Sequence, residues 1–127
     1  MAELGIATAD NRATFSPGEQ VQGTCGWWLD RAPSAIEMRL FWYTEGKGTK
    51  DVDVVDTIRF ESPAAQNRRE FSFTLPSGPY SFSGKLISLI WALELVVQPS
   101  GEAKRVQLTV SPSGEEIVLS PVDSQAE

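Results

Sequence analysis

The stretch FSFTLPSGPYSFSGK, residues 71–85, and the run LISLIWALELVV that follows it, residues 86–97, decide the fold of this chain. In the first stretch Phe71, Phe73 and Leu75 occupy alternate positions, so in an extended chain they point to the same side. Pro76 then ends the segment, because proline has no backbone N–H to donate to a neighbouring strand. The run at 86–97 falls short of the roughly 20 residues that a membrane-spanning helix needs. Both stretches therefore belong to the core of a folded domain.

The run at residues 86–97 fits two kinds of element. Leu86, Leu89 and Leu93 have helical spacing, and the flanking Gly84 and Pro99 permit either a helix or a strand. Its β-branched and aromatic content and the strand pattern around it favour a long strand. The residues expected to face the core are Leu89, Trp91, Leu93, Leu95 and Val97.

Strand-like segments recur along the rest of the chain. Gly and Pro punctuate segments that alternate with a period of two and are rich in Val, Ile, Phe, Trp and Thr. About eight strands are predicted, at residues 4–8, 20–29, 35–44, 52–61, 69–75, 85–98, 104–110 and 116–119. Because each sheet has to bury one apolar face, we expect an all-β fold, an immunoglobulin-like sandwich of two antiparallel sheets. The alternation predicts three core-facing sets: Val21, Cys25, Trp27 and Leu29; Ile36, Met38, Leu40 and Trp42; and Phe71, Phe73 and Leu75.

Length and composition limit the possible functions. The 127 residues suit one domain, which we expect at residues 1–122 with a frayed tail at 123–127. The net charge of −6 would repel nucleic acid. The chain contains no histidine, which excludes Ser-His and Cys-His nucleophile pairs. One cysteine and no basic, apolar leader indicate a reducing compartment, and the expected location is the cytoplasm. No motif for a cofactor is present.

Three features are candidates for chemistry, and each has a simpler interpretation. Asp51, Asp53 and Asp56 could hold a hard cation through carboxylate oxygens, but strand alternation separates Asp56 from the other two. Asp56 also falls on the core-facing parity of its segment, so we expect a β-bulge near Val55 that resets the register. The GKGTK stretch at 46–50 lacks the spacing of a phosphate loop and is interpreted as a hairpin turn. Cys25 falls on an inward parity, which predicts an unreactive thiol.

Several apolar side chains fall on the parity that should face solvent. Phe41 and Tyr43 lie opposite Leu40 and Trp42 in the alternation; Trp28, Ile90, Ala92 and Val96 are further examples. If Phe41, Tyr43, Ile90 and Val96 lie on neighbouring strands, they form a patch of the kind that marks a protein interface. Lys47 and Lys50, near the expected hairpin turn, could contact an anionic part of the same partner.

Two sets of residues resemble the arrestin family. The first is FSPGEQVQG at 15–23 with IEMRL at 36–40, and the second is FSFTLP at 71–76, PYSFSGK at 79–85 and LIWALEL at 89–95. The second set is similar to the family's Phe-x-Phe-x-Leu-Pro, Pro-x-Ser-aromatic-x-Gly and Ile-x-Tyr-x-Leu elements, with Trp91 in place of the tyrosine. The resemblance implies a single N-terminal-type arrestin sandwich, distantly related to retromer-associated arrestin-fold subunits and bacterial sporulation-control arrestin-like proteins.

The resemblance does not extend to specific arrestin activities. The chain has no early lysine pair that would read a receptor phosphate and no Pro-Pro-x-Tyr motif that would recruit a ubiquitin ligase. The matching residues are folding residues, which carry no ligand specificity. We therefore expect no catalysis, and a protein-interaction or adaptor module that self-associates. Two alternatives stay open: a metal-binding or enzymatic domain using the acidic cluster, and a purely structural self-assembling subunit.

Overall fold

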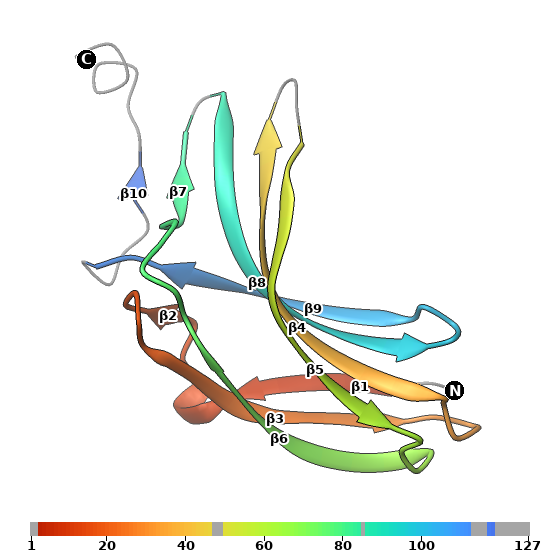
Figure 1. The fold of residues 1–127 in the computed structure, drawn as a ribbon. Helices are drawn as coiled ribbons and strands as arrows, with labels where there is room; N and C mark the ends of the chain where they lie inside the picture. The colour runs from red at the N-terminus through yellow and green to blue at the C-terminus, as the bar shows by residue number, and fades with distance from the viewer. Residues whose placement is uncertain (1–2, 47–49, 85, 113–116, 119–127) are drawn as a thin grey trace, which may run out of the picture.

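The computed structural model describes residues 3–46, 50–84, 86–112 and 117–118. Two β-sheets face each other (Figure 1). The smaller sheet, called the small sheet below, has three antiparallel strands in the order β1 (Glu3–Thr8), β3 (Gln20–Trp28) and β6 (Gln66–Thr74). A single 3-10 turn, η1 (Ala9–Asn11), follows β1.

The second sheet, called the large sheet, is built on two long central strands. β8 (Ile87–Gln98) pairs along its whole length with β4 (Ala35–Gly46), and β4 pairs on its other side with β5 (Val52–Glu61). The far edge of β8 is shared, because β7 (Phe82–Ser83) pairs with its first residues and β9 (Ala103–Val110) with the following ones. Two short strands pair in parallel at the margins, β10 (Ile117–Val118) with β7 and β2 (Thr14–Phe15) with β9.

The predicted all-β sandwich is confirmed, and so is the assignment of the run at 86–97 to a strand. β5 has the predicted bounds, and most other strands differ from the prediction by a few residues at their ends. The strands β2 and β7 were not predicted, because a two-residue strand is too short to show an alternating pattern. Of the strand predicted at 116–119 the structure describes Ile117 and Val118, and the predicted tail at 123–127 lies outside the described residues.

The core lies between the two sheets. The three predicted core-facing sets meet there, and of their members Trp42 alone is partly exposed. Trp91 is fully buried, and its indole N–H donates to the carbonyl oxygen of Pro79 at 2.9 Å. The indole N–H of Trp27 donates in the same way to the carbonyl oxygen of Ala64 at 2.9 Å. Both large rings are therefore buried without losing a hydrogen bond.

The bulge predicted near Val55 is present. On β4 and β5, Leu40 lies opposite Asp56, but the next residue of β4, Phe41, lies opposite Val54, so Val55 is the extra residue. The bulge changes which side chains of β5 share a face with Phe41. Val52 and Val54 turn to the face of the large sheet that points away from the small sheet.

One end of the large sheet extends beyond the small sheet. Figure 1 shows β4, β5 and β8 crossing the small sheet with their lower halves and rising away from it with their upper halves. We call this upper part the arm; it consists of residues 41–46 of β4, 52–54 of β5 and 87–92 of β8. β7 pairs with β8 inside the arm. The arm therefore presents sheet surface that the small sheet does not cover.

Candidate functional site

The candidate site is the outer face of the large sheet, which points away from the small sheet. On the arm this face is apolar. Tyr43 lies between Val52 on β5 and Ile90 on β8, and Phe41 lies between Val54 and Ala92 on the same two strands. We call these six residues the arm patch. The rings of Phe41 and Tyr43 stack with their centres 5.8 Å apart.

The arm patch has a buried floor and an exposed rim. Phe41 and Ile90 are 4% and 8% exposed, whereas Val52 and Val54 are 67% and 49% exposed. Among the residues that the structure describes, six large apolar side chains are exposed, and two of them, Val52 and Val54, lie side by side on the outer face of the arm. Ile87 also lies in the arm, but it shares the parity of Leu89 and Trp91 and so points to the opposite face of the sheet. Neighbouring exposed apolar side chains on one face are typical of interaction surfaces.

An arginine from β9 covers part of the arm patch. The Arg105 guanidinium carbon lies 4.9 Å from the ring centre of Phe41 and 5.1 Å from that of Tyr43. The same guanidinium donates to the carboxylate of Glu94 at 3.2 Å. The guanidinium is thus held over both aromatic rings by cation–π attraction and an ion pair. This contact explains how Phe41 is buried on an outer face.

Next to the arm patch the outer face is charged, and its charges are paired with one another. Glu37 accepts from Arg39 at 2.6 Å and from Arg59 at 2.5 Å, and Arg59 also donates to Glu61. The pKa of the Glu37 carboxyl lies below its usual range, chiefly because of the hydrogen bond from Arg39 and then the one from Arg59. Together with the pair of Glu94 and Arg105, this half of the face holds three carboxylates and three guanidinium groups.

The structure brings together only part of the residue set predicted from the sequence. Phe41, Tyr43 and Ile90 are neighbours, as expected for a patch on adjacent strands. Val96 lies away from them, opposite Glu37 in the charged half, and is 6% exposed. Lys50 is exposed just before β5, and Lys47 lies outside the described residues. Phe41 and Ile90 therefore form the buried floor of the arm patch, and Val96 is a buried residue outside it.

Val52 and Val54, the two most exposed members of the arm patch, were not predicted as contact residues. Val52 and Val54 alternate with Asp51 and Asp53, a pattern that indicates an ordinary edge strand. The signal that could have found them is the bulge, which places them beside Tyr43 and Phe41.

The other candidates for chemistry are not assembled in this structure. In the described part of the chain, no three His, Cys, Asp or Glu side chains lie close enough to hold a metal ion, and this includes Asp51, Asp53 and Asp56. Cys25 is fully buried, and burial raises the pKa of its thiol to about 11. A thiol with that pKa is protonated at neutral pH and is a poor nucleophile.

Comparison with solved structures identifies the architecture. The structure superposes on Spo0M, the sporulation control protein from Bacillus subtilis, with a TM-score of 0.61 and 19% sequence identity, covering 87% of this chain. The chain has an arrestin-like fold. It spans 49% of Spo0M, about half the length of that protein. At this level of identity the similarity concerns the fold and not the activity.

The other comparisons add no functional information. A β-glucosidase from Listeria innocua, in complex with gluconolactone, matches at 11% identity with a TM-score of 0.49, over 91% of this arrestin-like chain and 16% of the enzyme. No family model matches the sequence, and no curated protein does. Among the described residues, no helix is long and apolar enough to cross a membrane.

Proposed function

We propose that this chain is a non-catalytic protein-binding module and that the arm patch is its binding surface. The observation that carries the proposal is the exposure of Val52 and Val54 beside a rigid aromatic floor. Exposed apolar side chains over a fixed floor can bury apolar area against a partner without first reordering. The fold supports the same role, since an arrestin-like sandwich offers sheet faces and edges to a partner. A cytoplasmic adaptor or scaffold fits the single, buried cysteine.

A second copy of the chain is the first partner that we propose for the arm patch. A net charge of −6 opposes self-association through most surfaces. The outer face is an exception, because its carboxylates and guanidinium groups neutralise one another beside the apolar rim. Two arm patches can therefore meet in a two-fold arrangement where the same patch is used on both copies, with the charged half of the face outside the contact. Lys50 would lie at the margin of this contact.

Substitutions at the rim test the proposal better than substitutions in the floor. Phe41 and Ile90 are buried, so a charge at either position would disturb the fold itself. Val54→Asp places a charge at an exposed position of the arm patch. Thr57→Asp is the matched control, because Thr57 is exposed on the same strand and lies opposite Arg39 in the charged half.

Self-association is measured by sedimentation velocity over roughly 1 µM to 1 mM protein, a range that covers weak dimers. We expect the wild type and Thr57→Asp to form dimers with rising concentration. In Val54→Asp the dissociation constant should rise at least about tenfold, because a charge would be buried without a partner. A wild type that stays monomeric throughout contradicts the second copy as partner. If the wild type and Thr57→Asp then capture another protein and Val54→Asp does not, the arm patch is still the binding surface, and only the second copy is excluded as its partner.

A further inference from the structure

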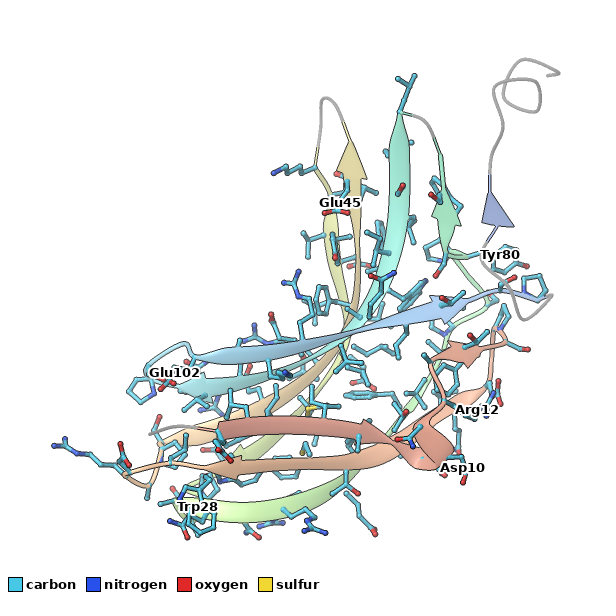
Figure 2. All side chains as sticks on the ribbon, turned by 180° about the vertical axis from the view of Figure 1, so that it is seen from behind. Asp10, Arg12, Trp28, Glu45, Tyr80 and Glu102 are labelled. Atoms are coloured by element: carbon cyan, nitrogen blue, oxygen red, sulfur yellow. The ribbon has the colours of Figure 1, made fainter. Side chains whose placement is uncertain are left out.

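The remaining exposed large apolar side chain, Trp28, lies far from the arm. It is 58% exposed at the C-terminal end of β3, on the side of the small sheet opposite to the buried Trp27. Figure 2 shows Trp28 at the far end of the small sheet, well away from Glu45 near the tip of the arm. An exposed tryptophan is costly to leave in water, and tryptophan is among the residues that contribute most to protein interfaces.

Two glycines beside Trp28 form the floor of a shallow hollow. Gly5 on β1 and Gly26 on β3 lie directly opposite each other, and both lie inside their strands. Neither is required by the fold: a Cβ at Gly5 would have no atom within 4 Å, and one at Gly26 would lie 3.6 Å from its nearest neighbour. Glycine inside a strand weakens it, so an unforced pair suggests that another backbone approaches closely there. Trp28, Thr24 and Arg68 line the same hollow.

Arg68 is the one cationic side chain among the residues that line the hollow, and Glu3 is the one anionic side chain. The chain has seven arginines, and five of them contact a carboxylate or an aromatic ring: Arg12, Arg39, Arg59, Arg69 and Arg105. Within the described residues, the side chains of the other two, Arg31 and Arg68, have no ion pair, hydrogen bond or ring contact. Arg68 lies opposite Gly26 in the register with β6, and Glu70, two residues further along β6, lies opposite Thr24 on the same face. Arg31 does not line the hollow.

We propose that this hollow, formed by Trp28, Gly5, Gly26 and Arg68, binds an acidic, extended segment of a partner protein. An apolar side chain of the segment packs against the indole of Trp28. Its backbone crosses the two glycines, and a carboxylate pairs with the free guanidinium of Arg68. Glu3 lines the opposite, β1 side of the hollow, so the carboxylate of the segment belongs on the β6 side. This surface is separate from the arm patch and does not depend on the function proposed for it.

The proposal is tested with three synthetic peptides, EDEFDED, EDESDED and KRKFKRK, added to ¹⁵N-labelled full-length protein. The readouts are the NMR signals of the Trp28 indole N–H, assigned with Trp28→Phe, and of the Gly5 and Gly26 amides. At about 2 mM peptide even a complex with a millimolar Kd is populated. We expect these three signals to shift with EDEFDED, and at least about tenfold weaker binding of the other two peptides. No shift with EDEFDED, equal shifts with all three, or a preference for KRKFKRK would overturn the proposal.

Variants separate binding from folding. Arg68→Glu should abolish the shifts, whereas Lys50→Glu makes the same change of charge at the arm and should leave them intact. Gly26→Ala adds a methyl group to the floor with no clash, so it should keep or raise the thermal stability and yet weaken EDEFDED binding at least about tenfold. Unchanged binding in Gly26→Ala overturns the close backbone approach. Concentration-dependent shifts of the same signals without peptide would identify a second copy as the occupant and overturn the acidic segment.

Discussion

Gly23 shows how a single residue sets the distance between β1 and β3. A Cβ at this position would lie 2.2 Å from the carbonyl oxygen of Ala7 and 2.8 Å from the ring of Phe71. The first of these neighbours is backbone and cannot move aside cheaply. We predict that Gly23→Ala lowers the free energy of unfolding by about 1–3 kcal/mol, the usual cost of overpacking a core. Urea denaturation followed by tryptophan fluorescence measures this change.

A neighbouring glycine provides the control for that prediction. Gly5 lies on β1 with open space at the Cβ position, so Gly5→Ala should leave the free energy of unfolding unchanged or raise it by up to about 1 kcal/mol. If both substitutions destabilise the protein equally, the close approach at Gly23 is not the cause. If neither does, β1 and β3 are not as close in solution as in this structure.

Cys25 lies on β3, the strand that also holds Gly23, and it allows a second test of a single residue. Its thiol is fully buried, and burial raises its pKa to about 11. We predict that a thiol reagent at pH 8 modifies Cys25 only when the protein unfolds, so the rate of modification follows the unfolding equilibrium as urea is added. Rapid modification without denaturant would show that β3 or β6 opens locally.

At the scale of the element, the charged half of the outer face links β4 to β5. Glu37 accepts hydrogen bonds from Arg39 and Arg59, which lower the pKa of its carboxyl below the unfolded value of about 4.3. Stability from this shift is fully present above the unfolded pKa and is lost as the pH falls through the folded pKa. We predict that Glu37→Gln unfolds more easily than the wild type at pH 7 but that the difference shrinks below about pH 4.3.

The matched control for Glu37 is Glu45, which lies on the same strand. Glu45 is exposed at the end of β4 and has no ion pair in the described part of the chain. Glu45→Gln removes the same charge but breaks no ion pair with an arginine. The unfolding temperature of this variant at pH 7 should therefore equal that of the wild type. A Glu37→Gln profile parallel to that of the wild type between pH 7 and pH 3 would show that the contacts with Arg39 and Arg59 carry no stability.

How far the sequence predicts each element depends on the length of its pattern. The long strands were predictable because Phe71, Phe73 and Leu75, for example, alternate over enough residues to fix which side is buried. β2 and β7 were not, since two residues carry no period. The bulge at Val55 was predictable from one carboxylate on the wrong parity, Asp56. The bulge also places Val52 and Val54 on the outer face, beside Tyr43 and Phe41, and this placement was not predicted.

The position of the candidate site depends on how far the strands of the large sheet extend beyond the small sheet. Alternation shows that Phe41, Tyr43 and Ile90 share the outer face, but it does not show how far each strand extends beyond the opposite sheet. The upper halves of β4, β5 and β8 rise away from the small sheet, and this creates the arm (Figure 1). The side chain of Arg105 then covers Phe41, which no sequence pattern indicates because the two residues lie on strands that do not pair.

The molecule has two separate candidate surfaces, which differ in chemistry. The arm patch is apolar and borders charges that are already paired, whereas the Trp28 hollow borders the unpaired Arg68. If both bind, the chain can hold two partners at opposite ends, as an adaptor would. We predict that Val54→Asp leaves peptide binding at the hollow unchanged and that Arg68→Glu leaves dimerisation at the arm unchanged, because distant sites contribute independently. Coupled losses would mean that one of the substitutions disturbs the fold.

Site-specific photocrosslinking in the cells that make the protein tests whether the arm patch binds protein. A photoreactive phenylalanine analogue placed at position 54 reports contact at the rim of the arm patch, and the same analogue at position 57 reports the charged half of the same strand. We predict a discrete crosslinked species from position 54, either a dimer or an adduct of fixed mass, and none from position 57. Equal, diffuse crosslinking from both positions, or none from position 54, would show that the arm patch is not a protein-binding surface.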